Sequence, residues 1–165
     1  MKEFLIPKEI QNIAEMLIQN GYVAYLVGGC VRDLLIGDLS TGGPKDWDIT
    51  TNAHPEEIQK LFPDSVYENN FGTVGIKTRS EEPTSKVVEV TTFRIEGTYS
   101  DKRHPDEIKF AKTVEEDLSR RDFTVNAMAL ALTENIQQTT HNKKEQKVVS
   151  GRLSVVGSLI DPYGG

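Results

Sequence analysis

The chain has 165 residues, 37% of them hydrophobic and 27% charged, so it is long enough to bury the core of one domain. Its formal net charge of −6 excludes a free-standing, strongly basic nucleic-acid binder. No apolar run reaches the roughly 18 residues that a membrane span needs, and the start lacks a signal-like apolar segment, so we expect a cytoplasmic protein. The single cysteine, Cys30, excludes an intrachain disulfide and a cysteine-based zinc site.

The first half of the chain alternates between the apolar patterns of helices and strands. Residues 8–20 carry a stripe at i, i+3, i+4, i+7 and i+8, which is typical of a helix with one buried face. We expect helices over residues 8–20, 31–36 and 55–62. We expect strands over residues 22–27, 47–51, 73–78 and 86–93, the last two separated by a hairpin-like loop over 79–85.

The second half is less regular. Residues 94–109 are rich in glycine, proline and charge and show no period, which indicates a mobile surface loop. Residues 113–117 can cap and start a helix that leads into residues 119–130. Residues 137–147 are polar and indicate a loop or hairpin tip. No internal repeat is evident, so we expect one compact unit.

Two acids, Asp46 and Asp48, lie at i and i+2 of a predicted strand. Side chains of a strand alternate between its faces, so both carboxylates should share one face while Trp47 and Ile49 enter the core. Hard divalent ions such as Mg²⁺ bind carboxylate oxygens, and the pair therefore indicates metal-dependent phosphate chemistry. The alternative is a solvated turn or strand end, in which this pattern is common.

Gly28 and Gly29 lie between a buried strand and a helix. Such a turn can present backbone N–H groups to an anion, and the helix amino terminus adds its positive dipole end. Arg32, about one turn into the helix, could bind the same phosphate, and Asp33 would then orient Arg32 or cap the turn. A simple tight turn is the alternative.

Glu89 is the best candidate for a third metal ligand, because it interrupts an otherwise apolar strand. A carboxylate between valines is costly if it is buried and unpaired. A salt bridge to Arg94 or Arg121 is the alternative role for this side chain.

A polar group of residues follows the predicted helix start: Arg120, Arg121, Asp122 and Asn126. Arginine forks suit triphosphate oxygens, whereas Arg120 is also compatible with a solvated basic face. Cys30 has no histidine at a spacing that would make it a nucleophile, so we interpret it as a packing residue.

Five ordered motifs resemble the class II tRNA nucleotidyltransferase and bacterial poly(A) polymerase family. They are residues 26–35 (LVGGCVRDLL), 46–49 (DWDI), 88–94 (VEVTTFR), 103–105 (RHP) and 116–129 (EDLSRRDFTVNAMA). The closing residues 161–165 (DPYGG) are similar to the motif at which this family's catalytic head ends and its helical neck begins. The match covers nearly the whole chain in the family's order.

The resemblance implies an α/β (α+β) nucleotidyltransferase head of the polymerase beta-like type, a mixed sheet with helices packed on one side. It implies two Mg²⁺ ions held by Asp46, Asp48 and Glu89. Nucleotide-binding residues would be Gly28, Gly29, Arg32, Arg121 and Asn126. The implied reaction transfers CMP or AMP from CTP or ATP to an RNA 3′ end, with tRNA as the expected acceptor, by two-metal catalysis.

The chain departs from the family pattern in a few places. Residues 40–45 are an expected loop insertion, and Glu96 stands where many relatives have aspartate. We expect residues 1–165 to be the head alone, because the neck motif that selects CTP or ATP and the tRNA-binding body and tail are not in this sequence. Poly(A) polymerases and C-only or A-only adding enzymes share this head, and a nucleotide-binding module that has lost catalysis is the alternative of another class.

Overall fold

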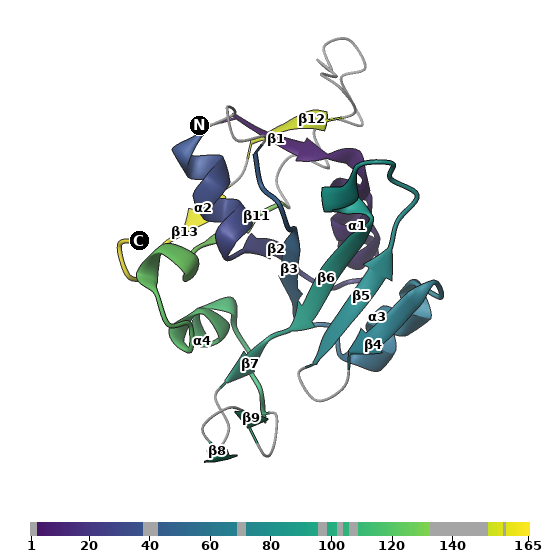
Figure 1. The fold of residues 1–165 in the computed structure, drawn as a ribbon. Helices are drawn as coiled ribbons and strands as arrows, with labels where there is room; N and C mark the ends of the chain where they lie inside the picture. Colours follow the sequence, from purple (N-terminus) through teal and green to yellow (C-terminus); the bar gives the residue numbers. More distant parts are fainter. Residues whose placement is uncertain are drawn as a thin grey trace.

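The computed structural model describes residues 3–37, 43–68, 72–95, 99–101, 104–105, 109–132, 152–156 and 158–165. Its centre is a seven-stranded mixed sheet in the order β13-β11-β2-β3-β6-β5-β4 (Figure 1). The strands of this sheet are β2 (Ala24–Val27), β3 (Asp48–Thr51), β4 (Ser65–Glu68), β5 (Thr73–Lys77), β6 (Val87–Thr92), β11 (Ala129–Ala131) and β13 (Ser158–Ile160).

The strands β3 and β6 form the one parallel pair among the described pairs of this sheet, and they set the geometry of its centre. Asp48 is in register with Glu89, and Thr50 with Thr91. Because side chains alternate along each strand, these four side chains share one face. Ile49 and Val90 point to the other face, where both are buried.

The larger core lies on the face that carries Ile49 and Val90. Helices α1 (Lys8–Gln19) and α3 (Pro55–Leu61) pack there, and α2 (Gly29–Ile36) adds Cys30 and Val31 to the same core. The predicted stripe of α1 is buried as Ile10, Ile13, Ala14 and Leu17. Helix α3 begins at a capping box between His54 and Glu57 and inserts Ile58 into the same core.

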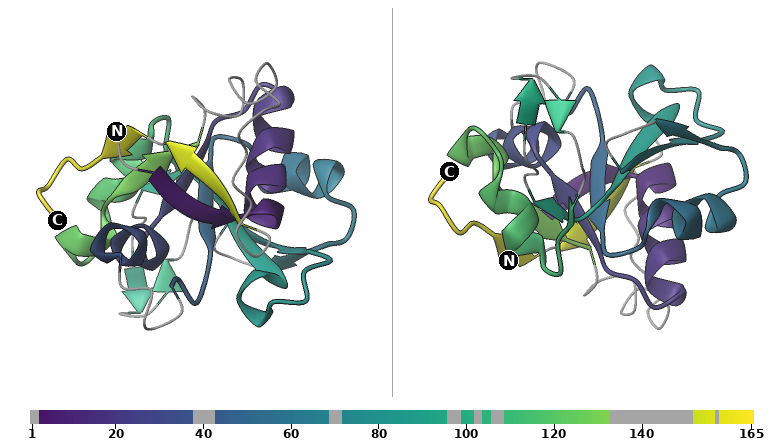
Figure 2. Two further views of the ribbon diagram at one scale, coloured as in Figure 1. Left: turned by 90° about the horizontal axis from the view of Figure 1, so that it is seen from above. Right: turned by 90° about the horizontal axis from the view of Figure 1, so that it is seen from below.

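A smaller core forms on the opposite face. The short helix α4 (Val114–Ser119) packs Val114 and Leu118 against Val27 and Ala129. Figure 2 shows α4 on one side of the strands and α1 with α3 on the other. The face that carries Asp48 and Glu89 is therefore the one against which α4 packs.

The chain adds an antiparallel ribbon that the sequence did not indicate. Strand β1 (Glu3–Pro7) pairs with β12 (Arg152–Val156), which joins segments from opposite ends of the sequence (Figure 1). Phe4 and Ile6 of β1 are buried in the larger core. The ribbon thus extends this core beyond the main sheet.

The predicted fold class, with its mixed sheet, is confirmed, but α4 lies on the face opposite α1 and α3, whereas helices on one side were expected. Most elements of the first half lie within a few residues of their predicted bounds. Helix α2 (Gly29–Ile36) starts at the glycine turn, and the loop between β5 and β6 contains a short 3-10 helix, η2 (Pro83–Ser85). Strand β4 was not predicted. None of the described helices is long and apolar enough to cross a membrane.

Two predictions in the second half are wrong. Residues 94–109 contain strand pieces, with β7 (Arg94–Ile95) paired to β10 (Lys109–Phe110) and β8 (Tyr99–Asp101) paired to β9 (His104–Pro105). The helix from residue 113 ends at Ser119, a 3-10 turn η3 (Thr124–Asn126) follows, and β11 replaces the predicted helical end. Pairing of β11 with both β2 and β13 overrides the helix propensity of its alanines and leucine. The predicted loop at 137–147, residues 40–42, Glu96 and Arg103 lie outside the described residues.

Candidate functional site

The three predicted metal ligands lie around one hollow beside the starts of the neighbouring strands β3 and β6. Asp46, Asp48 and Glu89 all line this hollow, whose volume is about 260 Å³. Trp47 and Ile49 enter the core with 1% of their surface exposed, as the alternation predicted. Asp48 is half-buried, whereas Asp46 and Glu89 are exposed.

The exposure of Glu89 changes the argument for its presence. The cost of burying a carboxylate is no argument for a metal at Glu89, because this side chain is exposed. The buried side chains of this part of β6 are those of Val88 and Val90. Its place in the site rests instead on its register with Asp48.

The donor set fits an open magnesium site and not a closed cage. Within the described residues, no three His, Cys, Asp or Glu side chains already form a group that could hold a metal ion. Magnesium usually keeps several waters and takes one or two carboxylates together with substrate phosphates. Asp46, Asp48 and Glu89 present the carboxylates that such binding requires.

Gly28 leaves room for two charged side chains beside the glycine turn. It precedes α2 with a φ of 75°, a conformation that glycine adopts without strain. A Cβ at this position would lie 3.3 Å from Arg121 Nη1 and 3.6 Å from Asp48 Oδ2. A side chain there would crowd both Arg121 and Asp48.

Arg32 is fixed beside the same turn. Its Nε and Nη2 contact Asp33 Oδ1 at 2.9 and 2.8 Å, which gives Asp33 the orienting role that the sequence suggested. Its Nη1 donates to Asn126 Oδ1 at 3.1 Å, which joins α2 to η3 across 94 positions of the chain. A Cβ on Gly29 would lie 3.5 Å from Arg32 Nη2, so the guanidinium lies over the turn.

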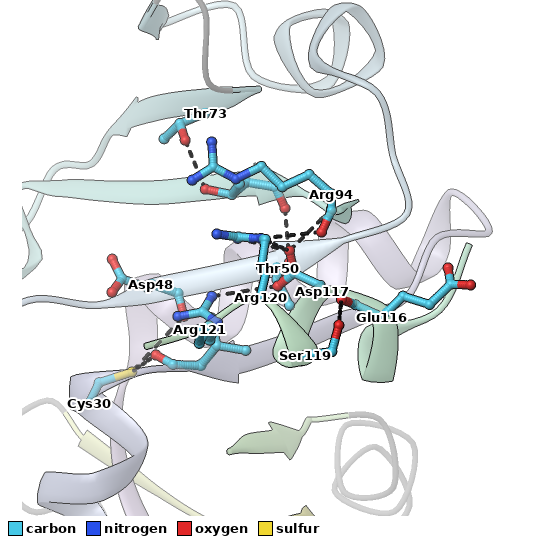
Figure 3. A network of polar contacts seen from close by, with 12 residues as sticks. Cys30, Asp48, Thr50, Thr73, Arg94, Glu116, Asp117, Ser119, Arg120 and Arg121 are labelled. Carbon is cyan, nitrogen blue, oxygen red and sulfur yellow. Dashed lines mark hydrogen bonds and ion pairs between the residues drawn. The ribbon is translucent and has the colours of Figure 1, made fainter. Parts of the chain in front are cut away.

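A highly connected polar group among the described residues is Asp117, which the sequence analysis did not select. Its side chain is fully buried, and its Oδ1 accepts hydrogen bonds from the Arg94 backbone N–H and from Arg120 Nε and Nη2 at 2.9–3.1 Å. Its Oδ2 lies 3.5 Å from Arg121 Nη2 and accepts from Thr50 Oγ1 at 3.4 Å. Figure 3 shows this network between α4, β3 and β7.

The sequence did contain a signal for this network. Asp117 precedes the two arginines by three and four positions, the spacing at which side chains meet on a helix. The network also corrects the interpretation of Arg120 as a solvated basic residue, because Arg120 is an ion-pair partner of a buried acid.

Burial shifts the pKa values of two charged side chains in the site, Asp48 and Arg121. Burial raises the pKa of Asp48. The positive charge of Arg121 acts against this rise, and the negative charge of Asp46 adds to it. Burial lowers the pKa of Arg121, and the negative charge of Asp117 acts against this fall. Within the described residues, the buried Nε of Arg121 has no hydrogen-bond partner. A site with these properties gains from a cation near Asp48 and an anion near Arg121.

Cys30 has the packing role that was expected. Its thiol is buried against the Val27 carbonyl at 3.1 Å, and burial raises its pKa to about 12. A thiol with such a pKa is not a nucleophile near neutral pH.

The chain matches the poly A polymerase head domain family over residues 24–148 and belongs to this family. It corresponds to the head portion of CCA-adding enzymes, which confirms the resemblance found from the motifs. It is 37% identical to the CCA-adding enzyme of Lactococcus lactis subsp. lactis over 99% of this chain and 40% of that protein. For the enzyme of Bacillus mycoides the identity is 41% over 94% of this chain and 37% of the relative.

Solved structures agree with this assignment. A Bacillus stearothermophilus CCA-adding enzyme in complex with CTP has 35% identity and a TM-score of 0.65, over 96% of this chain and 30% of that one. A tRNA nucleotidyltransferase complexed with a primer tRNA and an incoming ATP analog has 26% identity and a TM-score of 0.59, over 93% and 35% of the two chains. The chain thus spans about a third of the length of these relatives.

Replacing Asp117 by asparagine should destabilise the fold by about 3 kcal/mol, because it leaves two half-buried guanidinium groups without their carboxylate. The amide nitrogen would also face donors from Arg94 and Arg120. Urea unfolding measures the effect, with Asp122→Asn as a matched control at an exposed position of the same segment. An equal free energy of unfolding for Asp117→Asn and the parent would contradict the account of this network.

Replacing Asp48 by asparagine should raise the melting temperature of the metal-free chain at pH 7. A carboxyl whose pKa is higher in the folded state than its unfolded value of about 3.9 costs stability once it ionises. The gain of Asp48→Asn should therefore be present at neutral pH and vanish as the pH falls below about 4. Thermal unfolding in EDTA across this range tests it, with the exposed Asp64→Asn as control. A lower melting temperature for Asp48→Asn at pH 7 would contradict the desolvation argument.

Proposed function

We propose that the chain is a template-independent RNA nucleotidyltransferase head that transfers CMP or AMP from CTP or ATP to an RNA 3′ end, with tRNA as acceptor. The observation that carries this proposal is that the Arg121 guanidinium and the Asp48 carboxylate both lie beside Gly28. A cation that would bind phosphate thus lies near the carboxylates that would hold magnesium. The relatives solved with CTP, an ATP analog and primer tRNA support the same reaction.

The residues on the β2 side of Asp48 would bind the triphosphate. Arg32 and Arg121 would contact its oxygens with guanidinium forks, and the backbone N–H groups at Gly28 and Gly29 would add the positive end of α2. Asp33, Asn126 and Asp117 hold the two arginines in place before the ligand arrives. Such preorganisation lowers the cost of positioning the reacting groups.

Asp46, Asp48 and Glu89 would hold two Mg²⁺ ions, which when bound would lower the pKa of the RNA 3′-hydroxyl and neutralise the leaving pyrophosphate. In the reaction, the 3′-oxygen forms a bond to the α-phosphorus and loses its proton. The bond from this phosphorus to the oxygen that bridges it to the β-phosphate breaks, and pyrophosphate leaves with the electron pair. The side chains of this chain contribute position and charge and form no covalent intermediate.

Triphosphate binding should depend on magnesium and on Asp48. We expect heat from CTP and from ATP in calorimetry, with similar affinity, because the contacts proposed here are to the phosphates that both nucleotides share. EDTA or Asp48→Ala should weaken binding on the order of tenfold or more. Asp64→Ala serves as the control, and circular dichroism checks that each variant is folded. A folded chain that gives no heat with either nucleotide, or equal heat with and without Mg²⁺, contradicts the proposal.

CCA addition, poly(A) addition and C-only or A-only addition would use the same site in this head and differ in the product they make. Sequencing the products of the full-length protein on a tRNA that lacks its 3′ end separates CCA addition from poly(A), C-only or A-only addition. Nucleotide binding without transfer by the full-length protein would support the alternative of a nucleotide-binding module that has lost catalysis.

A further inference from the structure

The Asp117 carboxylate is shared unequally between two neighbouring arginines. Its Oδ1 accepts hydrogen bonds from Arg120 Nε at 3.1 Å and from Arg120 Nη2 at 2.9 Å, which are ordinary lengths for such bonds. Its Oδ2 lies 3.5 Å from Arg121 Nη2, which is longer than the distance typical of a charge-assisted hydrogen bond. The acid is therefore bound closely by Arg120 and loosely by Arg121.

Arg120 is held in this position by the strand β7. Arg120 Nε also donates to the Arg94 carbonyl at 3.2 Å, and the Arg94 backbone N–H donates to Asp117 Oδ1 at 3.1 Å. The backbone of Arg94 thus binds both members of the pair (Figure 3). The Arg120 side chain is 16% exposed, so solvent screens this pair far less than an ion pair on the surface.

Arg121 keeps hydrogen-bonding capacity that the protein does not use. Within the described residues, its buried Nε has no hydrogen-bond partner. Its Nη1 lies beside the glycine turn, 3.3 Å from the place of a Cβ on Gly28. A guanidinium that binds phosphate needs such donors, because every donor already bound to a carboxylate would have to be released first.

The charges around Asp117 explain how Arg120 affects its neighbour. Burial is the main cause that lowers the pKa of Arg121; the charge of Asp117 acts against this fall, and the charge of Arg120 adds to it. Two guanidinium groups thus compete for one buried carboxylate. If Arg120 lost its charge, Arg121 would be the remaining ion-pair partner of Asp117 among the described residues.

We propose that Arg120 is a positioning residue for triphosphate binding: by engaging Asp117, it keeps Arg121 from closing onto this carboxylate. This role rests on the proposed function, in which Arg121 contacts the phosphates. Arg120 acts through the acid that the two arginines share and does not touch the ligand. Without Arg120, the buried carboxylate would draw Arg121 closer, because an unpaired buried charge is costly.

Calorimetry on Arg120→Gln tests this role, because the substitution removes the charge and keeps a long polar side chain. CTP is compared, with Mg²⁺ present, with inorganic tripolyphosphate, which has neither ribose nor base. Arg120→Gln should weaken both ligands by a similar factor, on the order of tenfold, as expected for loss of a charge-assisted contact of Arg121. Arg79→Gln, which removes the charge of an exposed arginine between β5 and β6, is the matched control and should change neither.

Arg120→Lys gives a conservative variant of the same position. It keeps the positive charge near Asp117 but offers no guanidinium fork, so we expect affinities between those of the parent and of Arg120→Gln. Circular dichroism checks that each variant is folded. If Arg120→Gln does not fold, the comparison of Arg120→Lys with the parent and with Arg79→Gln carries the test.

NMR of the arginine side chains in the ligand-free, ¹⁵N-labelled chain adds a readout whose direction separates positioning from stability. A guanidinium held by a carboxylate rotates slowly about its Nε–Cζ bond. Arg120→Gln should slow this rotation in Arg121, because Arg121 then pairs more closely with Asp117. If Arg120 served only to stabilise the fold, its loss would leave the rotation unchanged or make it faster.

The outcomes distinguish this inference from the proposed function. Loss of affinity for CTP alone would show that Arg120 contacts the ribose or base, and would overturn the inference. Affinities equal to those of Arg79→Gln, or a rotation of Arg121 that is not slowed, would overturn it as well. A parent chain that binds neither CTP nor tripolyphosphate contradicts the proposed function, whereas the rotation of Arg121 is measured without any ligand.

Discussion

The buried carboxylate of Asp117 is the interaction on which the site depends. A buried charge needs partners, and Asp117 finds them in Arg120, Arg121, the hydroxyl of Thr50 and the backbone of Arg94. These partners belong to four segments: the end of α4, the turn after it, the central strand β3, and β7. Satisfying one acid therefore fixes the position of Arg121 relative to the strand that carries Asp48.

The same geometry explains why the site is poised for a ligand. Arg121 pairs with Asp117 but keeps a buried Nε without a partner in the described structure, and burial raises the pKa of Asp48. Both properties cost stability in the empty protein. A metal near Asp48 and a phosphate near Arg121 would repay this cost, as active sites commonly trade stability for function. The parallel pairing of β3 with β6 brings Glu89 into register with Asp48.

Sequence reasoning succeeded where a pattern is local. The stripe of α1, the glycine turn before α2 and the alternation around Trp47 are properties of adjacent residues. The ordered motifs predicted the family, and with it the fold. Two failures are long-range: β11 is a strand because β2 and β13 pair with it, and β1 is defined by β12. The exposure of Glu89 follows from the alternation of buried and exposed side chains along β6, which the sequence analysis did not apply to this residue. Asp117 was missed because its importance lies in burial, which its charge alone did not reveal.

The central claim is that Asp48, with Asp46 and Glu89, binds a divalent metal beside the triphosphate. Paramagnetic Mn²⁺, which suits the same carboxylate and water ligands as Mg²⁺, tests it directly when titrated into the ¹⁵N-labelled chain with CTP. The account predicts that the amide signals of Asp46, Asp48 and Glu89 broaden first, and that Asp48→Asn abolishes this at the same Mn²⁺ concentration. Broadening that begins instead at the acidic start of α3, or that Asp48→Asn leaves unchanged, would contradict it.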